Sequence, residues 1–386
     1  MVQTTMVQTM NNPVLAQQEE FSDYFEKIGS SVNNVVSTTD NEVGIGESLK
    51  EAVLTIDKVT LFRYLPIDGV KPANKKPLLI AYSLIGSYKM LDLQQDRSVI
   101  KNLLLKGIEV YVIDWGHPNK SDKWLSFDDY ILTYLSDCVD FIKARHLLTN
   151  ISLLGICEGG VFAACYASIH PERISSLALA VTPIDFHADL DAQADPSQAS
   201  VGYLNRLLRK FTRKDLEAMI DSFGYLPGET TGLVFLEMTL VKSLTKYNWE
   251  LLDSLAGDKD KVLNFLRMEK WLLDRPHHPS EAAKQWLIDL YNENKLIKKE
   301  FGLENQKVDL SRLSMPVLNI FAKHDHIVPP VTSQALKGYL QTKTKYEELE
   351  LNAGHIGAFV SGKANKLFSD KVAKWVSRKP VQKKGR

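Results

Sequence analysis

The chain has few cysteines, no net charge and no long apolar run. Its three cysteines in 386 residues are an odd number that fits a reducing compartment better than a framework of disulfide bonds. The 47 Lys and Arg residues balance the 47 Asp and Glu residues, so no overall field recruits nucleic acid or an acidic membrane. The longest apolar stretches, such as Leu78–Tyr82 and Ala178–Val181, are too short to span a bilayer.

The N-terminus lacks the features of a secretory signal as well. The first charged side chain is Glu19, so both the basic start and the apolar run of a signal peptide are missing. Apolar residues make up 44% of the chain and charged residues 24%, which is usual for a soluble globular protein. We therefore expect a cytoplasmic globular protein with no transmembrane segment and no nucleic-acid partner.

Short apolar runs alternate with helical patterns through the first half of the chain. Val53–Ile56 and Val59–Tyr64 predict a hairpin or two edge strands. Four further runs read as buried parallel strands: Leu78–Tyr82, Val110–Ile113, Ile151–Leu154 and Leu177–Val181. Helical patterns follow in between, at Asp96–Leu105, Phe127–His146 and Gly159–His170. This alternation predicts an α/β fold with a doubly wound, mostly parallel sheet.

The alternation stops after Pro183 and returns late in the chain. Pro316–Phe321 and Tyr346–Leu351 read as strands, and Lys363–Val376 reads as a closing helix. The intervening stretch is charged and mostly helical. We therefore expect a mainly helical cap inserted between two halves of one core, with a polar segment before them and a basic tail after them. The predicted parts are a flexible segment 1–45, core 46–183, cap 184–310, core 311–378 and tail 379–386.

The main chemical signal is the segment Gly155–Gly160, which reads Gly-Ile-Cys-Glu-Gly-Gly. It follows a predicted strand and opens a predicted helix, which is the nucleophile-elbow pattern of α/β-hydrolases with cysteine in place of serine. A Cβ at the flanking glycines would strike the neighbouring strand and helix. The turn places Cys157 at a helix N-terminus, where the dipole favours a thiolate, and lets the N–H of Glu158 point at a developing oxyanion.

The alternative for Cys157 is a buried structural cysteine in a tight turn. For Cys138 and Cys165, which fall on apolar helix faces, the structural interpretation is the favoured one.

A nucleophile needs a base and a group that orients the base. In this fold class they follow in the order nucleophile, acid, histidine, each on a loop after a late strand. Asp325 and His355 come directly after the last two predicted strands, so they are the predicted acid and base. His324 and His326 flank the acid and compete with it, and a loop-capping role is the alternative for Asp325. The other six histidines are predicted to be surface or capping residues.

A second oxyanion donor is expected on the loop after the strand at Leu78–Tyr82, where the N–H of Leu84 or Ile85 is the candidate. The usual His-Gly of hydrolases is missing from this loop. No metal-ligand spacing and no dinucleotide-binding loop occurs in the sequence, so we expect neither a metal nor a bound cofactor.

Cysteine at the elbow favours one class of reaction. An acyl group on cysteine is a thioester, so its transfer from coenzyme A is nearly isoenergetic, and the later transfer to an alcohol runs downhill. The elbow therefore suits acyl transfer from a thioester to oxygen, although hydrolysis is not excluded.

Six segments in this order resemble the catalytic subunit of polyhydroxyalkanoate synthases, over roughly Val53–Val376. The segments are Tyr88–Leu93, Val112–Gly116, Gly155–Gly160, Val181–Phe186, His324–Pro330 and Gly354–Gly357. The short length resembles the two-subunit (class III) kind. The uncharged N-terminal segment has no counterpart in that pattern.

The resemblance implies polymerisation of (R)-3-hydroxyacyl-coenzyme A, typically 3-hydroxybutyryl-coenzyme A, with release of coenzyme A. It implies that Cys157 is the nucleophile, His355 the base, and Asp325 an acid that also helps to activate the attacking 3-hydroxyl. It further implies an oligomer with a second, non-catalytic subunit at the surface of polyester granules in the cytoplasm. Two alternatives stay open: a thioesterase or polyester depolymerase on the same fold, and a non-enzymatic granule-associated scaffold.

Overall fold

The computed structural model describes residues 26–27, 29–73, 76–188, 208–228 and 256–378. Parts of three predicted segments lie outside these ranges: residues 1–25 and 28 of the flexible segment, residues 189–207 and 229–255 of the cap, and the whole basic tail. The chain divides into two compact units, one formed by Met1–Gly44 with Leu240–Lys270 and the other by Ile45–Thr239 with Trp271–Arg386.

In the smaller unit, residues from the start of the chain contact residues of the insertion. Residues 29–37 are helical, and α10 (Lys259–Leu273) begins in this unit. Lys259 pairs with Glu42 at 2.6 Å, and the Arg267 side chain donates to the carbonyl of Gly44 at 3.1 Å. The described part of the predicted N-terminal segment is thus bound to the insertion.

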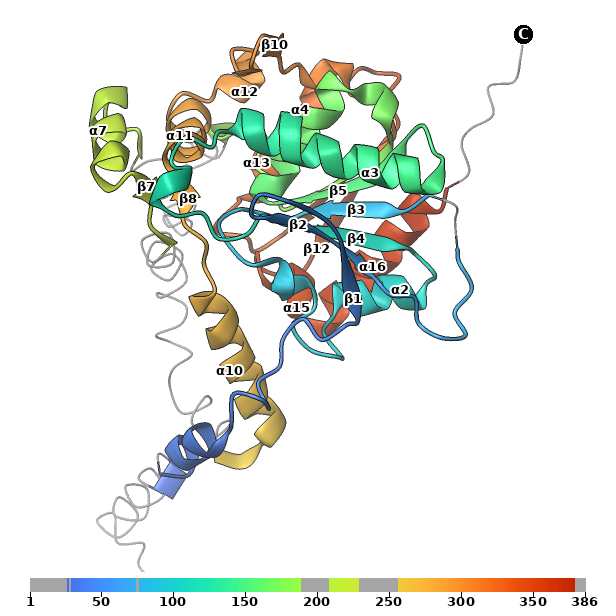
Figure 1. Ribbon diagram of the computed structural model, residues 1–386, viewed down its shortest axis with the longest axis vertical. Helices are drawn as coiled ribbons and strands as arrows, with labels where there is room; N and C mark the ends of the chain where they lie inside the picture. The colour runs from blue at the N-terminus through green and yellow to red at the C-terminus, as the bar shows by residue number, and fades with distance from the viewer. Residues whose placement is uncertain (1–25, 28, 74–75, 189–207, 229–255, 379–386) are drawn as a thin grey trace, which may run out of the picture. The chain divides into compact units, whose positions relative to one another are not determined.

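The larger unit is built on an eight-stranded sheet (Figure 1). The strand order is β1-β2-β4-β3-β5-β6-β11-β12. The first two neighbouring pairs are antiparallel and the remaining pairs are parallel, which confirms the predicted mostly parallel sheet. The strands are β1 (Lys50–Ile56), β2 (Val59–Tyr64), β3 (Leu78–Ala81), β4 (Val110–Asp114), β5 (Ile151–Ile156), β6 (Ile174–Ala180), β11 (Val317–Ala322) and β12 (Tyr346–Leu351).

Helices cover both faces of this sheet (Figure 1). One face carries α2 (Val99–Leu105) and α16 (Gly362–Val376), and the other carries η3 (Asp129–Leu135), α3 (Ser136–His146) and α4 (Glu158–Ile169). Between β11 and β12 run α13 (Pro330–Gln334) and α14 (Leu336–Tyr339), and α15 (Gly357–Val360) precedes α16. Three short helical turns are η1 (Tyr88–Leu91), η2 (Lys120–Asp122) and η4 (Pro171–Arg173).

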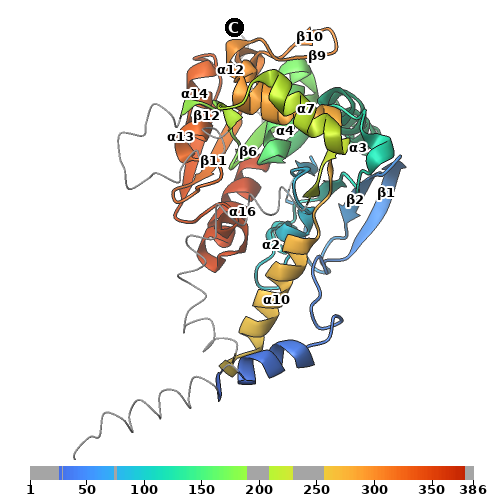
Figure 2. The ribbon, with the colours of Figure 1, turned by 90° about the vertical axis from the view of Figure 1, so that its left-hand side faces the viewer.

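The described elements between β6 and β11 are mostly helical, and in both views α7 and α12 lie on the α4 side of the sheet (Figures 1 and 2). Besides α10, they are α7 (Arg213–Phe223), β7 (Tyr225–Leu226), β8 (His278–Pro279), α11 (Ser280–Lys284), η6 (Gln285–Asn292), α12 (Lys295–Lys298), β9 (Gly302–Leu303), β10 (Gln306–Lys307) and η7 (Leu310–Arg312).

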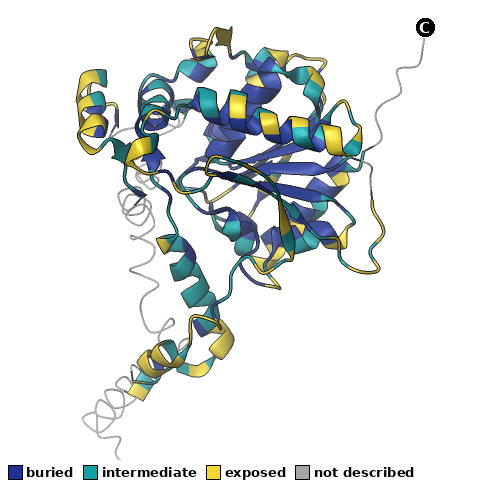
Figure 3. Cartoon of the chain, viewed as in Figure 1, coloured by how far each residue is buried: buried dark blue, intermediate teal, exposed yellow. Residues whose placement is uncertain are grey.

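The core lies in the central strands and in α4 (Figure 3). Every residue of β3 and β5 is buried, because parallel strands covered on both faces expose no side to water. Edge strand β12 instead exposes Glu348 and Glu350 in alternation. All twelve residues of α4 are buried, which explains its apolar, small-residue sequence. The elbow between β5 and α4 is therefore anchored between two fully buried elements.

Candidate active site

Cys157 lies at the sharp turn between β5 and α4. Its backbone dihedral angles are φ 54° and ψ −123°, a region that side-chain-bearing residues rarely adopt and that costs on the order of 1–3 kcal/mol. The N–H of Cys157 donates to the carbonyl of Ala180 at 2.9 Å, and the N–H of Gly160 donates to the carbonyl of Cys157 at 2.9 Å. The surrounding backbone thus holds the strained turn and leaves the half-buried side chain at the end of the sheet.

The glycines of the elbow are required by close packing. A Cβ on Gly155 would lie 2.5 Å from the Cα of Gly160, inside the helix. A Cβ on Gly159 would lie 2.3 Å from the carbonyl oxygen of Ala81 in β3, and one on Gly160 would overlap the side chain of Thr182. This confirms the steric reason for glycine predicted from the sequence and brings the start of α4 against the end of β3.

Asp325 and His355 meet at the same end of the sheet, on the loops after β11 and β12. The Nδ1 atom of His355 lies 2.7 Å from an Asp325 oxygen, Oδ2. The other oxygen, Oδ1, accepts hydrogen bonds from the N–H groups of Ile327 and Val328 at 2.9 and 2.8 Å. Since the carboxylate has no exposed surface, these contacts fix both its position and the orientation of the imidazole. His324 instead lies against the Asn352 side chain at 2.8 Å.

The His355 side chain also hydrogen-bonds the Cys157 side chain, so the three predicted residues form one chain of contacts. Burial lowers the pKa of His355, but the charges of Asp325 and Cys157 and their hydrogen bonds outweigh it and raise the pKa from 6.5 to about 10. The site therefore favours a protonated imidazole next to the sulfur at neutral pH.

This raised pKa predicts how the stability of the fold depends on pH. The unfolded chain loses the His355 proton around pH 6.5, whereas the folded chain keeps it up to a pH of about 10. The stabilisation is therefore complete below pH 6.5 and lost as the pH rises through about 10. We expect the difference in Tm between the wild type and His355→Gln to be largest near pH 6 and to shrink toward pH 10, as measured by calorimetry. A difference that grows with pH would contradict the raised pKa.

The three cysteines lie in different surroundings. Burial raises the pKa of the Cys138 thiol to about 12 and holds that of Cys165 well above its usual range, whereas Cys157 is partly exposed. The structural interpretation of Cys138 and Cys165 agrees with their burial.

We expect iodoacetamide to alkylate Cys157 at least about 100-fold faster than the other two cysteines in the native protein, because only a reachable thiolate reacts. Mass spectrometry of the digested protein measures the three rates. Denaturation in urea provides the control, since it should equalise them. Comparable labelling of Cys138 before unfolding would show that burial does not separate the three thiols.

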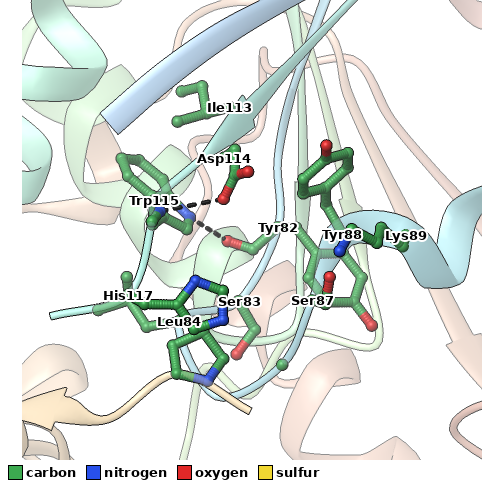
Figure 4. Close-up of a pocket in the computed structure, with 13 residues that line it drawn as sticks. Tyr82, Ser83, Leu84, Ser87, Tyr88, Lys89, Ile113, Asp114, Trp115 and His117 are labelled. Atoms are coloured by element: carbon green, nitrogen blue, oxygen red, sulfur yellow. Dashed lines mark hydrogen bonds between the residues drawn. The ribbon is translucent and has the colours of Figure 1, made fainter. Parts of the chain in front are cut away.

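The predicted oxyanion donors are engaged to different degrees. Glu158 is the first residue of α4, so its N–H has no partner within the helix and can face an oxyanion. On the loop after β3, the N–H of Ile85 donates to the hydroxyl oxygen of Ser83 at 3.0 Å. The N–H of Leu84 donates to the Glu158 carboxylate at 3.0 Å. Tyr82, Ser83 and Leu84 of this loop also line a small pocket (Figure 4).

Sequence reasoning missed a buried side chain that contacts Glu158. His278 was among the six histidines predicted to be surface or capping residues, and for His278 that prediction is wrong. It is 1% exposed, and its Nε2 lies 2.6 Å from the Glu158 carboxylate. The sequence signals were weak: Glu158 stands among glycines and apolar residues, and His278 stands in a Pro-His-His-Pro segment. Neither signal identifies the other residue as its partner.

None of the described helices is both long enough and apolar enough to cross a membrane. Within the described ranges, His, Cys, Asp and Glu side chains form no group of three or more that could hold a metal ion.

Comparison with known proteins finds similarity over almost the whole chain. Residues 76–361 match the family model described as alpha/beta hydrolase fold. The chain is 39% identical over 361 residues to the poly(3-hydroxyalkanoate) polymerase subunit PhaC of Allochromatium vinosum, an alignment that covers 94% of this chain and 97% of that one. It is 38% identical to the subunits of the same name from Synechocystis sp., covering 93% and 92%, and from Thiocystis violacea, covering 94% and 96%.

Proposed function

The chain belongs to the α/β-hydrolase fold family and, within it, to the poly(3-hydroxyalkanoate) polymerase subunit PhaC family, and we propose that it builds a polyester from (R)-3-hydroxyacyl-coenzyme A through an acyl group on Cys157. The observation that carries this proposal is the hydrogen-bonded chain from Asp325 through His355 to Cys157. It joins an acid, a base and a sulfur nucleophile at one edge of the sheet, where ligands bind in such folds.

The geometry gives each residue a role in two half-reactions. In the first, the Cys157 sulfur attacks the thioester carbonyl, the carbon–sulfur bond to coenzyme A breaks, and His355 returns the proton to the leaving thiol. In the second, His355 takes the proton from the 3-hydroxyl of another acyl unit, whose oxygen attacks the Cys157 thioester. The ester bond forms as the carbon–sulfur bond breaks, so the enzyme thiol is regenerated.

Asp325 supports both steps by holding the ring of His355 in one orientation and raising its basicity. The N–H of Glu158 supports both by facing the carbonyl oxygen, on which negative charge develops.

Family membership also supports proposals for the substrate, the partner and the location. We propose 3-hydroxybutyryl-coenzyme A as the substrate, a second non-catalytic synthase subunit as the partner, and the surface of polyester granules as the place of work. The relatives' name identifies them as subunits, which supports a partner chain.

The test mixes the purified chain with 3-hydroxybutyryl-coenzyme A and follows free thiol and turbidity together, with and without a candidate second subunit. Thiol release accompanied by turbidity supports polymerisation. Thiol release with free 3-hydroxybutyrate and no turbidity would indicate a thioesterase. A chain that releases no thiol under either condition, and leaves Cys157 unacylated, would instead support the scaffold alternative.

A further inference from the structure

Glu158 carries a fully buried carboxylate beside the nucleophile, with no exposed surface. One oxygen, Oε2, accepts hydrogen bonds from the Ser83 hydroxyl at 3.1 Å and from the N–H of Leu84 at 3.0 Å. The other, Oε1, lies 2.6 Å from Nε2 of His278. The roles assigned so far use only the backbone N–H of this residue and leave its side chain unexplained.

A carboxylate in such a place has to be stabilised by its surroundings. Removing an ion from water costs several kcal/mol unless hydrogen bonds replace the lost hydration. Glu158 accepts hydrogen bonds from Ser83 and Leu84, contacts Nε2 of His278, and lies in the first turn of α4, where the helix dipole favours negative charge. An apolar side chain would fill this position without any of these requirements, which points to a role for the carboxylate itself.

The three partners of the Glu158 carboxylate come from two separate parts of the larger unit. Ser83 and Leu84 lie on the loop after β3, and His278 lies in β8 of the insertion, 120 residues from Glu158. The side chain of Trp115 holds the same loop from another side, because its Nε1–H donates to the carbonyl of Tyr82 at 2.8 Å (Figure 4). Glu158 therefore connects the elbow, the loop after β3 and the insertion.

The hydrogen bonds also decide which N–H on this loop can serve an oxyanion. The N–H of Leu84 points at a charged acceptor, the Glu158 carboxylate, which binds it strongly. The N–H of Ile85 points at the neutral Ser83 hydroxyl, which in turn donates to Glu158. Because a charged oxygen accepts more strongly than a hydroxyl, a developing oxyanion can take over the N–H of Ile85 but not that of Leu84.

We propose that Glu158 is a positioning residue: its carboxylate fixes the Ser83–Ile85 loop so that the N–H of Ile85 serves as the second oxyanion donor, and its contact with His278 ties this arrangement to the inserted segment. The inference deepens the proposed function and rests on it, since the oxyanion arises when Cys157 attacks a carbonyl.

Two probes of Cys157 separate this role from a purely structural one. Iodoacetamide alkylates the sulfur by displacing iodide, and no oxyanion forms. p-Nitrophenyl acetate acylates the same sulfur through a tetrahedral oxyanion and releases p-nitrophenol. We expect Glu158→Ala to lower the acylation rate about 100-fold, the usual effect of losing one oxyanion donor, while the alkylation rate changes less than about threefold.

Two further variants make the test specific. Glu158→Gln keeps an oxygen that can accept from Leu84 and Ser83, so we expect its acylation rate to stay within about tenfold of the wild type. Ser83→Ala removes the hydroxyl that donates to Glu158, and with it one of the two hydrogen bonds by which the carboxylate holds the loop, so we expect about a tenfold loss of acylation with unchanged alkylation. These two decide the question if Glu158→Ala does not fold.

Asp92 provides the matched control, because it is also a buried carboxylate, but its donors are Ser48 and Ser98 and not residues of the Ser83–Ile85 loop. Asp92→Ala should lower the Tm without changing the ratio of the acylation rate to the alkylation rate.

Equal losses of the acylation and alkylation rates in the Glu158 and Ser83 variants, or no loss of acylation, would overturn the inference. A wild type that is acylated by p-nitrophenyl acetate but makes no polymer would overturn the proposed function and leave the Glu158 test intact.

Discussion

Replacing Cys157 with alanine is expected to eliminate the acyl-enzyme and to lower the release of coenzyme A by a factor on the order of 10⁴ to 10⁶. The change removes only a sulfur atom. Alanine keeps the Cβ and meets the same positive φ of 54°, so the strained turn and the fold should survive. Intact-protein mass spectrometry after brief mixing with 3-hydroxybutyryl-coenzyme A measures the acyl adduct directly.

Cys138→Ala and Cys157→Ser are the controls for that result. Cys138 is 1% exposed in the core, so its removal costs packing and stability but should leave the adduct on Cys157. Serine keeps a nucleophile with the same contacts, but its acyl group is an ordinary ester, so the nearly isoenergetic transfer from coenzyme A is lost and turnover should be severely impaired. An adduct found on another cysteine, or near-normal turnover of the serine variant, would refute the thioester interpretation.

The fold and the acid, base and nucleophile could be predicted from the sequence because their signals are local. Each buried strand is a short apolar run, and the elbow's glycines stand next to the cysteine they serve. Asp325 and His355 could be placed because each follows a strand directly and parallel strands bring their carboxyl ends to one edge.

Contacts between distant segments gave no such signal. Glu158 was recognised only for its backbone N–H, since its neighbours Ser83 and His278 are 75 and 120 residues away in the chain. The ion pair of Lys259 with Glu42 spans 217 residues, so no periodic pattern in the sequence indicates it.

The predicted helix Phe127–His146 contains the π-helical turn η3 near its start. The wider winding of this turn keeps residues spaced by four on one buried face.

Asp325→Asn tests how the buried acid divides its effect between the two half-reactions. Burial lowers the pKa of His355 and the Asp325 carboxylate raises it, so an amide in its place leaves a weaker base. A thiol is a far stronger acid than an alcohol, and a weakened base still deprotonates it. The 3-hydroxyl places a much larger demand on the base, so its activation should suffer more.

We therefore expect the first acylation of Asp325→Asn to fall roughly 10- to 100-fold and chain growth to fall about 10³- to 10⁴-fold. Rapid-quench measurement of the first adduct, beside steady release of coenzyme A, separates the two rates. His324→Asn is the matched control, because this neighbouring side chain is exposed and contacts Asn352 instead. Oδ1 of Asp325 accepts from two backbone N–H groups and Oδ2 contacts His355, so we expect the effect of the carboxylate on the hydroxyl to pass through His355. Equal losses in both steps would instead mean that the carboxylate only orients the ring and contributes nothing to its basicity.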